Sequence, residues 1–87
     1  MIEKYVLYVK KGCPFCVDAI ALLEERQEHY KLIALGADEK LIGEVKSALD
    51  WPTFPMVYSV SSSEEEKTLR LIGGYTDLYQ HFEKIDD

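Results

Sequence analysis

The sequence contains no apolar stretch near the roughly 20 residues that a helix needs to span a bilayer, so we expect no contact with a membrane. Met1 to Lys4 provide neither the basic region nor the following apolar segment of a signal peptide, which favours a cytoplasmic location. Basic residues are also scarce. The 10 Lys and Arg face 16 Asp and Glu, and the formal net charge of -6 argues against nucleic-acid binding.

Cysteine is rare as well. The two cysteines are too few for the disulfide framework of a small secreted domain. The 87 residues are 47% hydrophobic and 30% charged, which is typical of a soluble globular protein with one hydrophobic core. Neither a repeat nor a linker interrupts the chain. We therefore predict a single domain over residues 1–87 and expect a monomer.

The first half of the chain reads as strand, helix and strand. The apolar run from Tyr5 to Val9 predicts a strand covered on both faces. A helical pattern runs from Pro14, which suits a first helical turn, to about Glu28. Tyr30 to Leu35 predicts a second strand, which Gly36 closes, and we expect it to lie parallel to the first. The apolar stripe of the helix comprises Cys16, Ala19, Ile20 and Leu23, and its mostly solvated side chains are Glu24, Glu25, Arg26 and Glu28.

A second helix is predicted between Asp38, a good N-cap, and about Leu49. Its apolar face comprises Leu41, Ile42, Val45 and Leu49. The prolines between Trp51 and Pro55 prevent the helix from continuing. Trp51 itself suits a position over the core or on a partner surface.

The last part of the chain predicts a hairpin and a third helix. Met56 to Val60 and Thr68 to Ile72 are strand-like, and Ser61 to Glu66 has the composition of a solvated loop. Gly73 and Gly74 end the hairpin, Thr76 is the predicted N-cap, and Leu78, Phe82 and Ile85 mark the core face of a short helix. This order predicts an α/β fold with a small mixed sheet and helices on both faces.

The two cysteines, Cys13 and Cys16, lie at the junction of the first strand and helix. A thiol at a helix N-terminus faces unpaired N–H groups and the positive end of the helix dipole, and both favour the thiolate. Such positions lower a cysteine pKa from about 8.5 to about 3.5–7.5. We therefore predict thiol–disulfide exchange, in which Cys13 is exposed and attacks, and Cys16, one turn further, resolves the mixed disulfide.

Three other interpretations of the pair stay open: a buried inert pair, a structural disulfide and a zinc site. The spacing of Cys13, Cys16 and His29 matches three zinc ligands, but no second histidine follows at the required spacing. A bridge across so short a loop would restrict the unfolded chain very little. His29 and His81 are expected to be structural, because neither is spaced with another ligand or a nucleophile.

Nearly the whole chain resembles the glutaredoxins, members of the thioredoxin superfamily. Cys13-Pro14-Phe15-Cys16 is similar to their dithiol site Cys-Pro-Tyr-Cys, with Phe15 in place of tyrosine. Thr53-Phe54-Pro55 is similar to their Thr-Val-Pro, in which the proline is cis, and Gly73 to Asp77 resembles the glycine pair and Thr-Asp step before their last helix. The resemblance implies a thioredoxin-like fold with a four-stranded mixed sheet.

The resemblance also implies a glutathione site around Cys13. Lys10 would pair with a glutathione carboxylate, and the backbone of Phe54 would pair with the cysteinyl unit. Backbone N–H groups at Thr76 and Asp77 would take the γ-glutamyl carboxylate, and the Asp77 side chain its ammonium. Lys46 is a candidate for a further carboxylate-binding residue. The other residues assigned to this site are Phe15, Thr53, Pro55 and Gly74.

The function that the resemblance implies is glutathione-dependent reduction of protein disulfides and glutathionylated thiols, with glutathione as reductant and no metal. Disulfide-containing or glutathionylated proteins would be the partners, and ribonucleotide reductase is one plausible client. Two alternatives remain. One is a thioredoxin-like hydrogen donor recharged by a flavoprotein reductase, and the other is a carrier of a glutathione-ligated iron–sulfur cluster.

Overall fold

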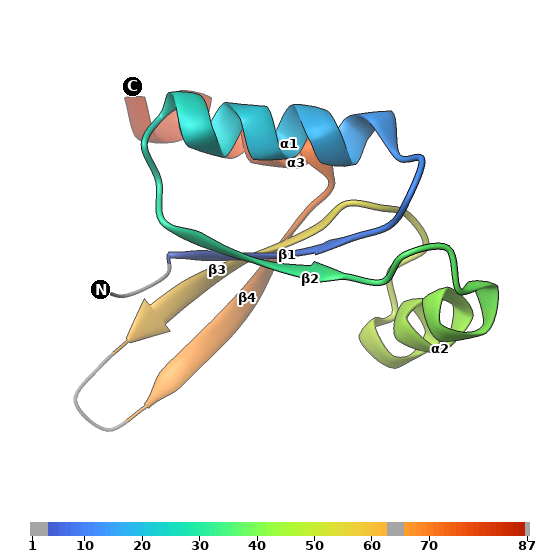
Figure 1. Cartoon of the computed structure of the whole chain (residues 1–87). Helices are drawn as coiled ribbons and strands as arrows, with labels where there is room; N and C mark the ends of the chain where they lie inside the picture. The colour runs from blue at the N-terminus through green and yellow to red at the C-terminus, as the bar shows by residue number, and fades with distance from the viewer. Residues whose placement is uncertain (1–3, 63–65, 87) are drawn as a thin grey trace.

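The computed structural model describes residues 4–62 and 66–86, and the side chains of residues 62 and 86 are not considered. The order of strands and helices is the predicted one (Figure 1). The elements are β1 (Tyr5–Val9), α1 (Pro14–Glu25), β2 (Tyr30–Ala34), α2 (Glu39–Leu49), β3 (Met56–Ser62), β4 (Lys67–Gly73) and α3 (Tyr75–Asp86).

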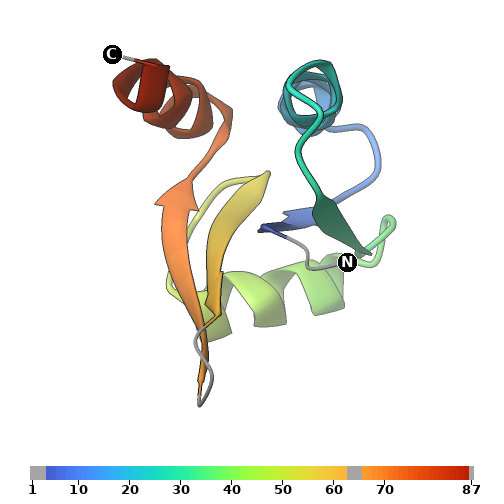
Figure 2. The same ribbon diagram turned by 90° about the vertical axis from the view of Figure 1, so that its left-hand side faces the viewer.

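The four strands form one mixed sheet in the order β2-β1-β3-β4. β1 is parallel to β2, with Leu7 opposite Leu32, and antiparallel to β3, with Leu7 opposite Val57. α1 and α3 lie side by side over one face of the sheet, and α2 lies on the other face near one end (Figures 1 and 2). The predicted mixed sheet with helices on both faces is therefore confirmed.

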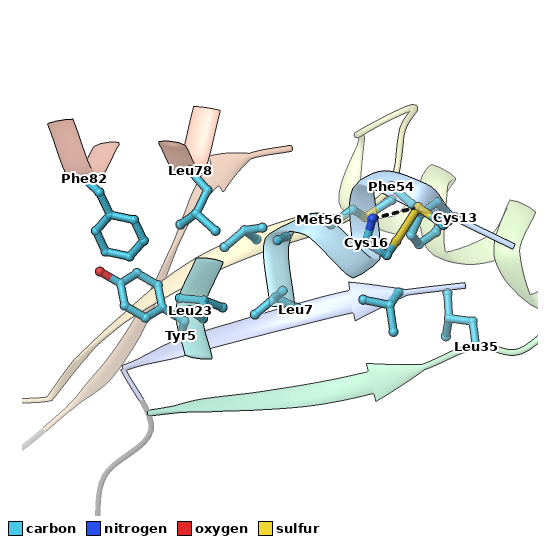
Figure 3. Close-up of a cluster of buried hydrophobic side chains, with 13 residues drawn as sticks. Tyr5, Leu7, Cys13, Cys16, Leu23, Leu35, Phe54, Met56, Leu78 and Phe82 are labelled. Carbon is cyan, nitrogen blue, oxygen red and sulfur yellow. Dashed lines mark hydrogen bonds between the residues drawn. A yellow bond between two sulfur atoms is a disulfide. The ribbon is translucent and has the colours of Figure 1, made fainter. Parts of the chain in front are cut away.

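The core lies between the sheet and the pair α1 and α3. Leu7, Leu23 and Leu78 come from the sheet and the two helices, and all three are fully buried. Figure 3 shows this cluster running from Tyr5 and Phe82 at one end to the two cysteines at the other. The cysteine pair is therefore built into one end of the core.

The end of α1 differs from the prediction, because the helix stops at Glu25 rather than near Glu28. Gln27 adopts a left-handed conformation with φ of 58°. The N–H groups of Gln27 and Glu28 return to the carbonyls of Glu24 and Leu23 at 3.0 and 2.9 Å, which is a Schellman motif. Arg26 is half-buried rather than solvated, since its guanidinium lies 4.2 Å from the centre of the Phe82 ring.

α2 begins as predicted, because the Asp38 carboxylate accepts a hydrogen bond from the N–H of Leu41 at 3.1 Å. The structure describes every residue of α2, and none of them is fully buried. Leu41, expected on the apolar face, is 39% exposed. The reason is that α2 covers only one end of the sheet (Figure 1). Trp51, just after the helix, packs against the core.

The hairpin strands are longer than predicted, because β3 continues to Ser62 and β4 starts at Lys67, with these two residues paired. Residues 63–65 of the predicted loop lie outside the described part of the chain. In α3, Ile85 is 60% exposed although it was expected on the core face. Within residues 4–62 and 66–86, no helix has the length and apolar character needed to cross a membrane.

Candidate functional site

Cys13 occupies the N-cap position of α1, directly before Pro14. Its backbone is extended, with φ of -110° and ψ of 101°, and its carbonyl accepts hydrogen bonds from the N–H groups of Cys16 and Val17 at 3.1 and 3.3 Å. The Cys16 N–H also donates to the Cys13 sulfur at 3.2 Å. An N-cap side chain normally satisfies one N–H of the first turn, and here a sulfur does so. This contact and the helix dipole both stabilise negative charge on Cys13 Sγ.

Cys13 and Cys16 form a disulfide, with their Cα atoms 5.2 Å apart. In this oxidised form Cys13 is 8% exposed and Cys16 is 3% exposed. The prediction that Cys13 is exposed is therefore wrong for the disulfide form, because both sulfurs pack in the core cluster. Cys13 is still the more accessible of the two.

The zinc interpretation does not fit the fold. The carbonyl of His29 accepts hydrogen bonds from Lys4 and Tyr5, at the start of β1, whereas the cysteines follow the other end of that strand. Across residues 4–62 and 66–86, no three His, Cys, Asp or Glu side chains are grouped so that they can hold a metal ion.

Phe54 lies near the disulfide, and two lysine side chains lie close to its ring (Figure 3 shows Phe54 and the cysteines). The Phe54–Pro55 bond is cis, as the resemblance implied, and the Phe54 ring is buried. The Lys10 and Lys46 ammonium groups lie 5.6 and 5.9 Å from the centre of that ring. The structure thus brings two lysines, distant in sequence, to one aromatic side chain. Pro55 is fully buried, and its side chain lines neither of the hollows described below.

The start of α3 is capped from inside the helix. The Asp77 carboxylate accepts a hydrogen bond from the Gly74 N–H at 2.9 Å, and the Leu78 N–H donates to the Gly74 carbonyl at 3.0 Å. Gly74 is therefore the N-cap, and the prediction that Thr76 caps the helix is wrong. Thr76 is exposed in the first turn, where the N–H groups of Tyr75, Thr76 and Asp77 have no acceptor within the helix.

Gly73 makes this cap possible. Its φ is 129°, and a Cβ placed there would lie 2.7 Å from Cγ of Asp77. Only glycine accepts both the backbone conformation and the close approach of the carboxylate. The glycine pair therefore has a physical role that its sequence position alone did not specify.

The predicted site residues other than Pro55 line two hollows, and both hollows include residues of α1 in their lining. One, of about 240 Å³, is lined by Phe15, Thr53, Phe54, Gly74, Tyr75, Thr76 and Asp77. The other, of about 410 Å³, includes Lys10, Cys13 and Cys16 in its lining. The structure thus brings the predicted residues to one end of the sheet, but arranges them around two hollows rather than one groove.

Tyr75 is the site residue that sequence reasoning missed. Its ring stacks on that of Phe15, with centroids 6.2 Å apart and planes inclined by 23°, and the Tyr79 ring follows at 6.4 Å. Phe15 and Tyr79 are largely exposed. The signal was present in the sequence, because Tyr75 and Tyr79 are separated by one helical turn and follow the glycine pair.

The comparisons with known proteins agree with this geometry. A family model described as Glutaredoxin matches residues 5–61. The solution structure of a glutaredoxin from Brucella melitensis is 26% identical, with a TM-score of 0.67, and the match covers 95% of this chain and 82% of that one. No curated protein matches the chain.

Two further solved structures show the fold alone. Glutaredoxin 1 from Francisella tularensis, complexed with cacodylate, is 24% identical with a TM-score of 0.67, and 94% of each chain is covered. A thioredoxin from Plasmodium falciparum is 12% identical with a TM-score of 0.57, and the match covers 97% of this chain and 73% of that one. The predicted thioredoxin-like fold is therefore confirmed, and the matched family together with the cysteine pair supports thiol–disulfide oxidoreductase chemistry.

Proposed function

Because this chain belongs to the glutaredoxin family, we propose that it is a glutathione-dependent oxidoreductase that reduces protein disulfides and glutathione mixed disulfides. The observation that carries the proposal is the position of the disulfide. Cys13 caps α1 and lines one hollow together with Lys10, and Phe15, two residues further along the chain, lines the hollow at the start of α3. The start of α1, which stabilises a thiolate on Cys13, thus lies next to side chains that can bind a small anionic thiol such as glutathione.

The reduced protein begins the exchange with the Cys13 thiolate, which the Cys16 N–H and the helix dipole stabilise. Attack on a client disulfide forms a mixed disulfide and releases one client thiolate. Cys16 then attacks Cys13 Sγ, releases the second client thiol and forms the disulfide seen in the structure.

Two glutathione molecules restore the dithiol. The thiolate of the first attacks Cys13 Sγ, forms a glutathione mixed disulfide and releases Cys16 as a thiolate, which takes up a proton. The thiolate of the second attacks the glutathione sulfur, so that glutathione disulfide leaves and Cys13 returns to the thiolate. The two electrons that reduce one client disulfide therefore come from two molecules of glutathione.

Charge complementarity gives glutathione an orientation in the site. The unpaired N–H groups at the start of α3 suit the γ-glutamyl carboxylate, and the Asp77 carboxylate suits its ammonium. Lys10 and Lys46, whose ammonium groups both lie within 6 Å of the centre of the Phe54 ring, suit the glycine carboxylate. Thr53 and Phe54 line the same hollow as Thr76 and Asp77, and the backbone of Phe54 would pair with the cysteinyl unit as an added strand.

The proposed clients are disulfide-containing or glutathionylated proteins in the cytoplasm, ribonucleotide reductase among them, and the protein would act as a monomer. These assignments extend the resemblance and the acidic, soluble composition of the chain.

The decisive experiment measures reduction of a glutathionylated peptide by glutathione, coupled to glutathione reductase, in the wild type and two variants. Cys13→Ser should abolish turnover. Cys16→Ser should retain it, because free glutathione can resolve the mixed disulfide on Cys13. Equal loss in both variants would contradict the assigned roles. Turnover with a flavoprotein thioredoxin reductase and none with glutathione would favour the hydrogen-donor alternative.

A further inference from the structure

We propose that this protein has a second binding site, for a phosphate group, at the end of the core opposite the disulfide. The site is a hollow of about 370 Å³, called here the basic pocket, and its lining is Ser59, Arg70, Leu71, Ile72, His81 and Lys84. The proposal does not depend on the proposed redox function, because none of these residues belongs to the site around Cys13.

The fold places two sheet residues on the floor of the basic pocket. Ser59 and Arg70 are partners in the antiparallel register of β3 and β4. Partners in such a register project to the same face of the sheet, so the Arg70 side chain and the Ser59 hydroxyl lie on one side. The Ser59 oxygen makes only a long contact of 3.5 Å with the Arg70 carbonyl, which leaves the hydroxyl free to turn towards a ligand.

α3 supplies the wall above this floor. His81 and Lys84 are three positions apart, and residues with that separation share one face of a helix. Figure 2 shows α3 lying above the ends of β3 and β4. Donor groups therefore approach the hollow from two directions, from the sheet and from the helix.

The imidazole of His81 is held in position by the core. Its Nε2 lies 3.4 Å from the hydroxyl of Tyr5, and its ring contacts those of Tyr5 and Phe82 edge to face. Burial raises the pKa of Tyr5, and the charge of Glu28 adds to this effect, so the tyrosine keeps its proton at neutral pH. When Tyr5 donates to Nε2, the other ring nitrogen carries a proton and becomes a donor.

The charge of the basic pocket contrasts with that of the chain. The protein carries a net charge of -6, yet the residues described around this hollow include two basic side chains, Arg70 and Lys84, and no Asp or Glu. A phosphate monoester carries about two negative charges at neutral pH and has oxygens on all sides. It can therefore accept from the arginine fork, the lysine, the serine and the histidine together, whereas a carboxylate has only two oxygens, which lie in one plane, and so offers fewer acceptor positions to donors from the sheet and the helix.

Position separates this pocket from the redox site. His81 contacts Tyr5 and Phe82, and Figure 3 shows those two side chains at the end of the core away from Cys13 and Cys16. A ligand in the basic pocket therefore does not cover the disulfide. Phosphate binding and thiol exchange can occur on the same molecule.

The test is a titration followed by amide chemical shifts in NMR spectra, at constant ionic strength. The probes are inorganic phosphate, O-phosphoserine and acetate. Arg70→Gln and Lys84→Gln remove the two cations from exposed positions, where folding should be unaffected. Lys40→Gln, on the exposed surface of α2, is the matched control because it removes the same charge elsewhere.

Saturable shifts confined to Ser59, Arg70, His81 and Lys84 are expected with phosphate, and their dissociation constant should rise roughly tenfold in each pocket variant and stay unchanged in Lys40→Gln. Equal binding of O-phosphoserine identifies an esterified phosphate as an acceptable ligand, and binding of inorganic phosphate alone identifies the free ion. Shifts that do not saturate, that acetate reproduces, or that persist unchanged in both pocket variants would overturn the proposal.

Discussion

Replacement of Gly73 by alanine tests the capping of α3 most directly. The added Cβ would lie 2.7 Å from Cγ of Asp77, and the residue would have to keep a φ of 129°. A side chain in such a backbone conformation costs about 1–3 kcal/mol. Displacing the Asp77 carboxylate from the Gly74 N–H removes a hydrogen bond worth about 0.5–1.5 kcal/mol. We therefore expect the free energy of unfolding to fall by about 1.5–4.5 kcal/mol.

Urea denaturation of the oxidised protein, followed by far-ultraviolet circular dichroism, measures this difference. Gly43→Ala is the matched control, since Gly43 lies inside α2 with no atom within 4 Å of the added Cβ. That change should raise the free energy of unfolding by about 0.5–1 kcal/mol, because alanine favours a helix over glycine. A Gly73→Ala protein as stable as the wild type would refute the account of this cap.

Two further variants test single side chains. Asp77→Asn keeps an acceptor for the Gly74 N–H but removes the charge, so the KM for glutathione should rise roughly tenfold with kcat retained. An unchanged KM would contradict a role for Asp77 in binding. Burial, with the charge of Glu28 adding to it, raises the pKa of Tyr5, so the folded state holds this proton more tightly than the unfolded chain. Stability should therefore be complete below the unfolded pKa of about 10 and decline as the pH rises above it. Tyr5→Phe should make that decline shallower, whereas Tyr79→Phe, at a largely exposed residue, should leave it unchanged. Equal declines in the Tyr5→Phe protein and the wild type would exclude Tyr5 as the source.

The sequence specified the elements around the cysteines well. β1 begins at Tyr5 and ends at Val9, as the apolar run predicted, because a strand covered on both faces contrasts sharply with the charged residues beyond it. Pro14 and Asp38 also marked helix starts correctly. These signals are local, since capping and the fixed φ of proline act within one turn.

Three features were not predicted from the sequence, and two of them depend on residues distant in the chain. Ile85 follows the periodicity of Leu78 and Phe82 but is exposed, because a helical period does not reveal where the surface beneath the helix ends. Gln27 ends α1 in a conformation usually reserved for glycine, so composition gave no warning. Lys46 was only a candidate until the fold brought it to Phe54.

The burial of the disulfide makes folding and redox chemistry one linked equilibrium. Both sulfurs belong to the core cluster together with Leu7 and Ala19. Any difference in conformational stability between the dithiol and disulfide forms must therefore appear in the reduction potential, at about 30 mV for each 1.4 kcal/mol. Ala19 lies one turn after Cys16 and is fully buried, so a substitution there can shift the potential without touching either cysteine. The reduction potential of the Cys13–Cys16 pair therefore depends on the packing of the core around it.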